Sequence, residues 1–365
     1  MTIATGVLEM KTVNVLSSTR RGEWDGFLSA SPDSTFYHTY EWTEILRIGA
    51  GIVPSFWGLW LDGELSVIWP CFVIPAFGGK LLYSPSTDGA PLVKSGVKLD
   101  CLNDIVQYAF ATARKQGVLH WSFDVPTKSY FVNLAPGLGF ESSSSPRCTY
   151  NVDTALPSET LWKRLASVTR TAVRQARKNS LEIKSSSEHD EFAAFFSIYQ
   201  STMRRRQLTA LRDPGSLATW LMRLTEEGKT KLFVATYRGD IVAGVLLLLY
   251  KKRAHWWLGA SLPDSWKLRP NELLMWNVIE WASNFGYYNL ELGGTPSRGT
   301  HGLNTFKRHL GGERVELVRF TLPVNHLKDQ LSTSLVGMYR KVKQHGLVPQ
   351  FFTDRVLKRR NAWFD

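Results

Sequence analysis

Hydrophobic and polar positions follow two different periods along the chain, and the same succession of periods occurs twice. In the first half, strand-like runs at 56–61 and 65–74 are joined by the turn Asp62-Gly63, and a shorter strand at 81–84 follows. A helical period at 102–116 and a strand at 118–124 complete the series. The pattern predicts a unit with the order strand, turn, strand, strand, helix, strand.

The second half repeats this order. Strands are expected at 232–237, 241–250 and 255–261, and the turn Gly239-Asp240 follows the first of them. A helix at 271–284 ends before Gly286, and a final strand spans 287–292. Two copies of one mixed unit in a single chain predict a duplicated α/β domain.

The segments outside the two copies complete the predicted organisation. Helices are expected at 40–48, 159–179 and 188–206, and the serines at 142–145 with Pro146 predict a flexible join between the halves. We therefore predict an N-terminal domain at 1–148, a C-terminal domain at 149–325 and a basic amphipathic helical tail at 326–365. Because the tail carries aromatic as well as basic residues, it either packs across a domain or rests on an anionic membrane surface.

Composition adds a charge to this picture. The 365 residues include 44 Lys and Arg against 32 Asp and Glu, and the net charge of +12 favours an anionic partner such as nucleic acid, lipid or a phosphate-rich small molecule. The three cysteines, Cys71, Cys101 and Cys148, lack the spacing of a zinc site or a disulfide framework, so no metal is expected. No signal peptide is evident and the longest apolar run, 241–250, is too short to span a membrane. We expect a cytoplasmic protein, with peripheral membrane contact as an alternative.

Five local strings carry a resemblance to a known family. They are FYHTYEW at 36–42, RTAVRQAR at 170–177, YQSTMRRRQ at 199–207, LRPNELLMW at 268–276 and LELGGTPSRGTHGLNTFKRHLGG at 290–312. With the order of elements, they resemble the Fem family of tandem acetyltransferase-fold proteins, which includes the aminoacyl-tRNA-dependent transferases that build peptidoglycan cross-bridges. The resemblance extends over residues 34–320 and reaches relatives linked to polysaccharide or natural-product pathways. It implies a mixed α/β (α+β) fold of two tandem acyl-CoA N-acyltransferase (GNAT-like) domains.

The last of these strings places candidate catalytic residues in the second copy. Its strand ends in Gly293-Gly294, and adjacent glycines let a backbone approach a ligand closely, although a plain turn is the more common reason for such a pair. Glu291 precedes them and could orient or deprotonate an amine, or cap the next helix. The resemblance implies a functional lysine at Lys307, which could stabilise a carbonyl oxyanion or hold a phosphate. The alternative for Lys307 is a solvated surface position.

A basic stretch opens the second half and supplies candidate phosphate contacts. Arg170, Arg174 and Arg177 lie with Lys163 on one face of the helix predicted at 159–179. Such a face suits a tRNA backbone or a pyrophosphate, but it is also what an ordinary solvated face looks like.

Other candidates come from separate parts of the chain. The resemblance suggests that one of the arginines at 204–206, Arg204 or Arg205, faces a substrate phosphate. Arg47 in the first half and Asn271 at the start of the helix 271–284 are further substrate-binding candidates.

The loop before the helix 271–284 argues against acyl-CoA as a cofactor. Acetyl-CoA-dependent members of this fold usually carry a glycine-rich loop there, whose N–H groups hold the pyrophosphate at a helix N-terminus. This chain has KLRPNE at 267–272, and Pro270 has no N–H to offer. We therefore expect no cofactor, and we expect the donor to be aminoacyl-tRNA or another activated acyl donor.

Three functions remain open at this point. The first is transfer of an aminoacyl group to an amine of a cell-wall or peptide acceptor, with an anionic cell-envelope precursor as one example. The second is CoA- or carrier-dependent N-acylation of an amino sugar or metabolite in polysaccharide or natural-product biosynthesis. The third is a non-catalytic binding protein that keeps the fold. Since the eight histidines are scattered and no Ser-His-Asp or Cys-His arrangement is visible, direct attack without a covalent enzyme intermediate is the expected chemistry.

Overall fold

The computed structural model describes residues 11–332 and 334, except 77, 85, 86, 88, 207, 209, 210 and 298–300. These residues form two compact units. Unit 1 comprises 11–44, 52–143 and 319–334, and unit 2 comprises 45–51 and 144–318. Neither unit is one continuous segment, because the chain passes between them inside helix α2 (Tyr40–Ala50), after Gly51, and inside strands β9 (Glu141–Asp153) and β16 (Glu313–Pro323).

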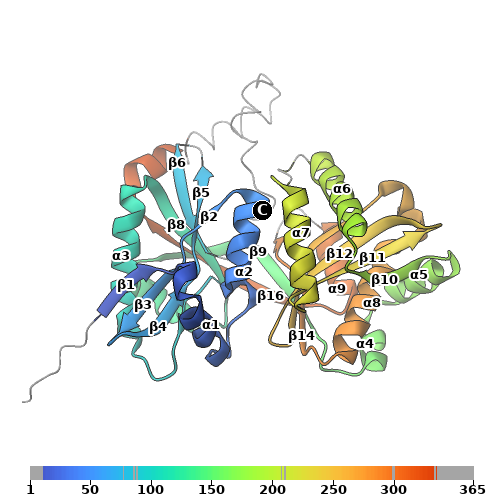
Figure 1. Cartoon of the computed structure of the whole chain (residues 1–365), viewed down its shortest axis with the longest axis horizontal. Coiled ribbons are helices and arrows are strands. Elements are labelled where there is room, and N and C mark those ends of the chain that lie inside the picture. The colour runs from blue at the N-terminus through green and yellow to red at the C-terminus, as the bar shows by residue number, and fades with distance from the viewer. Residues whose placement is uncertain are drawn as a thin grey trace, which may run out of the picture. The chain divides into compact units, whose positions relative to one another are not determined.

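Unit 1 contains two sheets (Figure 1). The first has the order β1-β3-β4-β7 with antiparallel neighbours, and its strands are β1 (Lys11–Val15), β3 (Trp57–Leu61), β4 (Glu64–Trp69) and β7 (Leu92–Val93). The second has the order β16-β8-β6-β5-β2, with β2 (Val53–Pro54), β5 (Phe72–Ala76), β6 (Gly79–Tyr83) and β8 (Val118–Pro126). Helices α1 (Arg21–Ala30) and α3 (Leu102–Lys115) and the first turn of α2 belong to the same unit.

The prediction of one strand at 65–74 was wrong, because the structure has two strands there. The ladder between β3 and β4 ends at Trp69, and Pro70 follows without an N–H to continue it. Phe72 then begins β5, which pairs with β6 in the other sheet. Pro70 thus separates a strand of the first sheet from a strand of the second.

The core of unit 1 is aromatic. Trp69 lies 4.4 Å from Trp121 between ring centroids, and Phe123 and Phe131 also contact Trp69 edge-on. Edge-to-face and tilted contacts of this kind stabilise a core beyond simple area burial. The surplus of tryptophan in the sequence therefore serves packing in this unit.

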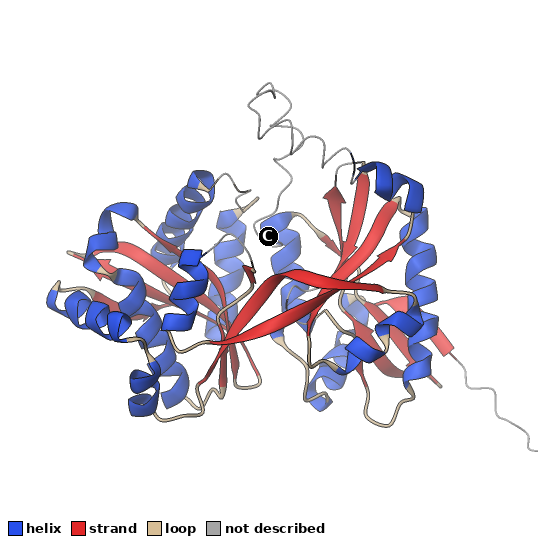
Figure 2. Ribbon diagram, turned by 180° about the vertical axis from the view of Figure 1, so that it is seen from behind, coloured by secondary structure: helices blue, strands red, loops and turns tan. Residues whose placement is uncertain are grey.

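Unit 2 is built on a sheet with the order β10-β11-β12-β13-β14-β9, in which only β13 and β14 run parallel. Its other strands are β10 (Glu182–Ser186), β11 (Thr230–Tyr237), β12 (Asp240–Tyr250), β13 (Arg253–Ser261), β14 (Asn289–Glu291) and β15 (Thr295–Pro296), which pairs with β9. Figure 2 shows helices flanking these strands. They are α4 (Ser158–Arg164), α5 (Ser167–Lys178), α6 (His189–Arg205), α7 (Pro214–Glu226), α8 (Pro270–Asn284) and α9 (His301–His309).

Strand β12 shows why this sheet is covered on both faces. Val245, Leu247 and Leu249 belong to the hydrophobic cluster that also contains buried residues of α5 and α8. At Gly244, one position along, an added Cβ would lie 2.4 Å from the ring of Phe195 on α6. Alternate residues therefore face different helices, and this is why the run 241–250 is apolar at nearly every position.

The mixed α/β fold is confirmed, and the repeat seen in the sequence has a structural counterpart. Strands β3, β4 and β6, helix α3 and strand β8 occur in this order in unit 1, with β5 and β7 inserted among them, and β11, β12, β13, α8 and β14 occur in the same order in unit 2. In each unit the strand after the helix pairs in parallel with an earlier strand, β8 with β6 and β14 with β13.

Two predictions about the middle of the chain were wrong. The helix expected at 159–179 is two helices, α4 and α5, separated by Leu165-Ala166, and strand β10 follows them. The flexible join expected at 142–146 lies inside strand β9, where the Ser145 hydroxyl accepts a hydrogen bond from the backbone of Arg147. Serine predicts loops because its side chain competes for backbone groups, but pairing with neighbouring strands overrides that tendency. Of the predicted tail at 326–365, residues 326–332 are helical, and everything beyond residue 334 lies outside the described residues.

Candidate active site

The candidate site lies where the parallel strands of unit 2 part. Strands β13 and β14 pair only from Arg253 to His255 and from Asn289 to Glu291. Strand β13 then continues to Ser261, whereas the chain after β14 turns away at Gly293, which has a φ of +75°. An added Cβ there would lie 2.8 Å from the backbone oxygen of Trp256, so both the dihedral angle and the close approach require glycine.

Lys307 lies beside this turn. Its helix, α9, carries it inward, and only 3% of the residue is exposed. The ammonium Nζ donates to the backbone oxygens of Gly293 at 2.7 Å and Gly294 at 3.4 Å, and it lies 5.7 Å from the ring centroid of Trp256. Lys307 is therefore a buried cation that fixes the Gly-Gly turn, and not a solvated surface lysine.

Burial lowers the pKa of Lys307 from 10.5 to about 7. The nearby carboxylate of Glu291 acts in the opposite direction, and the positive charge of Arg147 lowers the pKa further. A lysine with this pKa exchanges its proton near neutral pH, which is the range in which a general acid or a switchable cation is most useful.

Glu291 ends strand β14 as a buried carboxylate. Its Oε1 accepts a hydrogen bond from the Thr149 hydroxyl at 3.1 Å, and its Oε2 lies 2.9 Å from Nδ1 of His255. Thr149 comes from β9 and His255 from β13, so the two neighbouring strands hold the carboxylate in place. A carboxylate that orients an imidazole is a common arrangement for proton transfer.

Sequence reasoning missed three residues of this cluster. Thr149 and His255 bind Glu291, and Arg147 lies on β9 with its guanidinium beside Gly294, where an added Cβ would come within 2.6 Å of Nη2. Arg147 and Thr149 are both buried and lie two positions apart, the period of one strand face. That alternation was the available signal, and the expectation of a loop at 142–146 concealed it. His255 had no comparable local signal, because its importance comes from the register with Glu291.

A second polar cluster forms where β13 ends and α8 begins. The hydroxyl of Ser261 accepts from Asn271 Nδ2 at 3.1 Å and from Trp266 Nε1 at 2.9 Å. The guanidinium of Arg205, at the end of α6, stacks on the Trp266 ring with its carbon 5.3 Å from the centroid. The structure thus brings Asn271 and Arg205 together around one tryptophan, and both Arg204 and Arg205 are exposed.

The remaining predicted residue from the first half, Arg47, is exposed near the end of α2. That part of the helix belongs to unit 2, in which the backbone oxygen of Gly49 accepts from the backbone N–H of Arg212.

The predicted basic face is divided by the break between α4 and α5. Lys163 lies on α4, and the guanidinium of Arg170 donates to the backbone oxygens of Lys163, at 3.1 Å, and of Leu165. Arg170 therefore binds backbone carbonyls at the end of α4. On one continuous helix its guanidinium would instead have pointed outward to a phosphate. Arg174 and Arg177 are exposed on α5, and Arg174 stacks on Trp162.

The start of α8 is a poor cradle for a pyrophosphate. Arg269 precedes it in the left-handed region, with a φ of +62°, and Pro270 occupies the first helical turn. Glu272 places a carboxylate in that turn, 3.9 Å from the Arg269 guanidinium. An anion at this position would find no N–H donor on Pro270 and would be repelled by the carboxylate of Glu272.

The corresponding place in unit 1 holds an ion pair. Asp124, near the end of β8, is fully buried and accepts two hydrogen bonds from the Arg319 guanidinium, at 2.9 and 2.7 Å. A bidentate pair of this kind engages both carboxylate oxygens of Asp124. Unit 1 thus has a structural salt bridge at the position where unit 2 has its candidate site.

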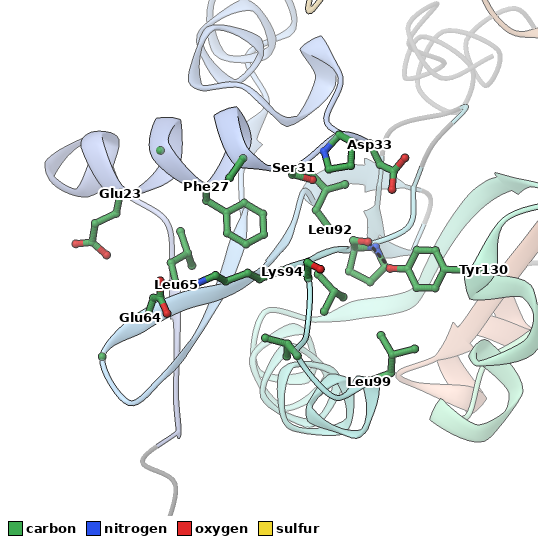
Figure 3. A pocket seen from close by; sticks show the side chains of 18 residues that line it. Glu23, Phe27, Ser31, Asp33, Glu64, Leu65, Leu92, Lys94, Leu99 and Tyr130 are labelled. Atoms are coloured by element: carbon green, nitrogen blue, oxygen red, sulfur yellow. Dashed lines mark hydrogen bonds and ion pairs between the residues drawn. The ribbon is translucent and has the colours of Figure 1, made fainter.

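Unit 1 also contains a cavity of 1020 Å³ (Figure 3). Its apolar wall includes Phe27 and Leu92, and Glu23, Asp33 and Glu64 supply three carboxylates against the single cation of Lys94. Glu64 is paired with Lys94 and Glu23 lies 3.7 Å from the Arg20 guanidinium, so two of these three carboxylates already have a cation nearby.

Two further features bear on the class of protein. Within the part of the chain that the structure describes, no group of three His, Cys, Asp or Glu side chains is placed to bind a metal ion. No helix among those residues has both the length and the apolar character needed to cross a membrane.

Comparisons with known proteins agree with this geometry. Residues 163–308 match the family described as an acetyltransferase (GNAT) domain. The crystal structure of FemX superimposes with a TM-score of 0.68 at 16% identity, covering 88% of this chain and 99% of that chain. No curated protein matches the sequence closely enough to count as a relative.

Two other solved structures share the architecture. A tandem GNAT protein from the clavulanic acid biosynthesis pathway has a TM-score of 0.59 at 13% identity, covering 87% of this chain and 99% of that one. L-PGS from Bacillus licheniformis has a TM-score of 0.59 at 12% identity, covering 88% and 96%. The chain therefore has the tandem GNAT fold of the Fem-like proteins, and this fold with the matched domain indicates an N-acyltransferase.

Proposed function

We propose that the chain is a Fem-type N-acyltransferase that moves an aminoacyl group from aminoacyl-tRNA to an amine of a cell-wall or peptide acceptor. The observation that carries the proposal is the buried Lys307, held between the parted strands with Glu291 nearby. This arrangement offers a cation and a carboxylate in one low-dielectric site, which is what acyl transfer to an amine requires.

The chemistry follows from these groups. The acceptor nitrogen attacks the carbonyl carbon of the ester, a C–N bond forms, and negative charge builds on the carbonyl oxygen. Among the described residues two backbone oxygens accept from the Lys307 ammonium, which leaves one of its three N–H donors for that oxyanion. A comparable donor contributes about 3–4 kcal/mol to transition-state stabilisation.

Proton transfer completes the reaction. The amine loses a proton as it attacks, and the pair of Glu291 and His255 is placed to take it up. When the carbonyl re-forms, the C–O bond to the donor breaks, and the leaving ribose oxygen takes up the proton that the pair of Glu291 and His255 accepted. An ester donor needs no further activation, so positioning and charge stabilisation supply the remaining rate.

Two observations favour a tRNA donor over a conventional CoA thioester. The start of α8 combines Pro270 with the carboxylate of Glu272, which disfavours a pyrophosphate. Arg174 and Arg177 are exposed on α5, so they are available to an RNA phosphate backbone. The similarity in fold to FemX is consistent with this assignment.

The second candidate is CoA- or carrier-dependent N-acylation of an amino sugar or metabolite. It is favoured by the GNAT domain match over residues 163–308 and by the similarity in fold to the tandem GNAT protein from the clavulanic acid biosynthesis pathway. The two candidates share the acceptor chemistry and differ in the donor.

The test supplies each donor separately to the purified chain. Aminoacyl-tRNA carrying a radiolabelled amino acid, or labelled acetyl-CoA, is incubated with a panel of amines that includes a peptidoglycan-type peptide and an amino sugar. We expect labelled amide only with aminoacyl-tRNA, and we expect RNase to abolish it. Product that forms from acetyl-CoA and survives RNase would overturn the tRNA assignment and support the second candidate.

A pair of lysine variants tests the site itself. Lys307→Met removes the buried cation while keeping an unbranched side chain, and Lys231→Met is the matched control. Lys231, on strand β11, is also partly buried, and burial lowers its pKa as well. Its ammonium lies over the rings of Phe233 and Trp281. We expect transfer to fall at least about a hundredfold in the first variant, because one oxyanion donor contributes that much, and to stay near the parent level in the second. Equal activity in the two folded variants would refute the role of Lys307.

A further inference from the structure

Two turns at one edge of unit 2 place aromatic rings and lysines side by side. Lys251 and Lys252 form the turn between β12 and β13, and Phe285 to Tyr288 connect α8 to β14. The Lys252 ammonium donates to the backbone oxygen of Phe285 at 3.1 Å, and the backbone N–H of Tyr288 donates to the oxygen of Lys252 at 3.0 Å. These bonds hold the two turns together, and we call Lys251, Lys252, Phe285, Tyr287 and Tyr288 the aromatic–lysine edge.

Two rings of this edge are exposed to solvent. Phe285 is 62% exposed and Tyr288 is 48% exposed, although each carries a large apolar surface. Behind them, Trp281 stacks on Phe285 with 5.6 Å between ring centroids and lies 4.8 Å from Tyr287. Exposed aromatic rings on a rigid aromatic base are costly in water and indicate a surface that is covered in use.

Lysine ammonium groups lie at the same level as the rings. Lys252 is 5.3 Å from the centroid of Tyr287, and Lys251 is 5.7 Å from that of Tyr250. Lys231 approaches Trp281 at 5.4 Å. Glu280 and Lys184 line a cavity of 240 Å³ together with Trp281 and Phe285, so this cavity contributes one negative and one positive charge beside the rings.

We propose that the aromatic–lysine edge docks unit 2 on the surface of an anionic lipid bilayer. Aromatic rings flanked by lysines match the boundary between headgroups and acyl chains, where a ring contacts hydrocarbon and an ammonium contacts lipid phosphate. Phe285 and Tyr288 enter that boundary, and Lys251 and Lys252 remain at headgroup level.

The contacts of the rings favour a membrane over a single-stranded nucleic acid. Base stacking needs open ring faces. The faces of Trp281 and Tyr287 already carry lysines and neighbouring rings, whereas the exposed surface belongs to Phe285 and Tyr288 at the tips of the turn. Insertion of Phe285 and Tyr288 between lipid headgroups and acyl chains does not require that a ring face be free for stacking.

Co-flotation of the full chain with vesicles tests the proposal. The vesicles contain phosphatidylcholine alone or phosphatidylcholine with phosphatidylglycerol, and binding is measured at low and high salt. We expect binding to the anionic vesicles only, with an affinity that falls as salt rises. The paired change of Phe285→Ser and Tyr288→Ser should weaken it about tenfold, because it removes exposed apolar area at the tip.

A charge variant and matched controls separate this edge from general basicity. Lys251 and Lys252 both have positive φ, so Lys251→Asn with Lys252→Asn keeps residues that tolerate this conformation. We expect about a 30-fold loss of binding, since each lysine near an anionic surface contributes about 1 kcal/mol. The control pair Lys115→Asn with Lys128→Asn removes the same charge from exposed positions of unit 1, and Tyr108→Ser removes an exposed ring there.

Each outcome decides the question. Parent-level vesicle binding by the aromatic variant, or equal losses in the control variants, would overturn the proposal, as would tighter binding to a single-stranded oligonucleotide than to vesicles. The aromatic–lysine edge does not include Lys307 or Glu291, so amide formation and vesicle binding are separate readouts. Failure of one leaves the other interpretable.

Discussion

The buried lysine makes a quantitative prediction about stability and pH. In the unfolded chain Lys307 keeps its proton up to about pH 10.5, whereas in the folded chain the pKa is about 7 because the side chain is buried. Between these values the unfolded state binds more protons than the folded state, so the free energy of unfolding rises as the pH rises. The buried Lys307 side chain therefore lowers the free energy of unfolding near neutral pH, and it lowers it less at higher pH.

The size of this effect follows from the two pKa values. Over the full range the shift corresponds to about 5 kcal/mol, and from pH 7 to pH 9 the folded protein should gain about 2 kcal/mol relative to a variant that does not titrate there. Lys307→Met is that variant. It loses the hydrogen bonds to Gly293 and Gly294 at both pH values, so this loss cancels in the comparison.

Urea unfolding of the parent and of Lys307→Met at pH 7 and pH 9 measures the difference. Other groups that titrate in this range contribute equally to both proteins and also cancel. A gain of about 2 kcal/mol in the parent alone supports the reasoning. A difference between the two proteins that is the same at both pH values would show that Lys307 keeps its proton throughout, and the argument from burial would then be wrong.

Three further predictions concern neighbouring residues. Glu291→Gln should lower the rate of transfer by about a hundredfold or more, because the pair with His255 loses its charge, and steady-state kinetics with a far-UV spectrum of the variant checks both rate and fold. Gly293→Ala should lower the free energy of unfolding by about 1–3 kcal/mol, since an added Cβ meets the Trp256 backbone and the φ is positive. Gly302→Ala, in helix α9, meets none of the described atoms within 4 Å and should leave that free energy unchanged or raise it by up to about 1 kcal/mol in the same urea titration. Asp124→Asn should lower it by about 3–5 kcal/mol because Arg319 loses its bidentate partner, and a melting temperature equal to that of the parent would contradict this.

The sequence was informative about features that depend on local order. The repeat was visible because period two and period 3.6 succeed each other within short windows, and turn glycines such as Gly239 and Gly286 mark where they change. Lys307 could be singled out because its string is local as well. The division of the strand at Pro70 was also available, since a proline cannot donate to a ladder.

The surroundings of the site could not be predicted in the same way. Thr149 and Glu291 are 142 positions apart, and only the register of β9 against β14 brings them together. The lowered pKa of Lys307 depends on burial by residues from several elements, which no local pattern reports. Periodicity predicts which face of a strand is buried, but it does not predict which residue of another strand lies opposite.

The discontinuity of unit 1 has a consequence for synthesis on the ribosome. Asp124 is made 195 positions before Arg319, and the strand that carries Arg319 also completes the sheet beside β8. At about 5–20 residues per second, the nascent chain waits about 10–40 s with this carboxylate unpaired. Unit 1 is therefore the first to emerge from the ribosome, but it cannot be the first to complete folding. Ribosome-bound chains stalled with residue 300 outside the exit tunnel should show rapid proteolysis in 52–143, and chains stalled with residue 334 outside should show protection.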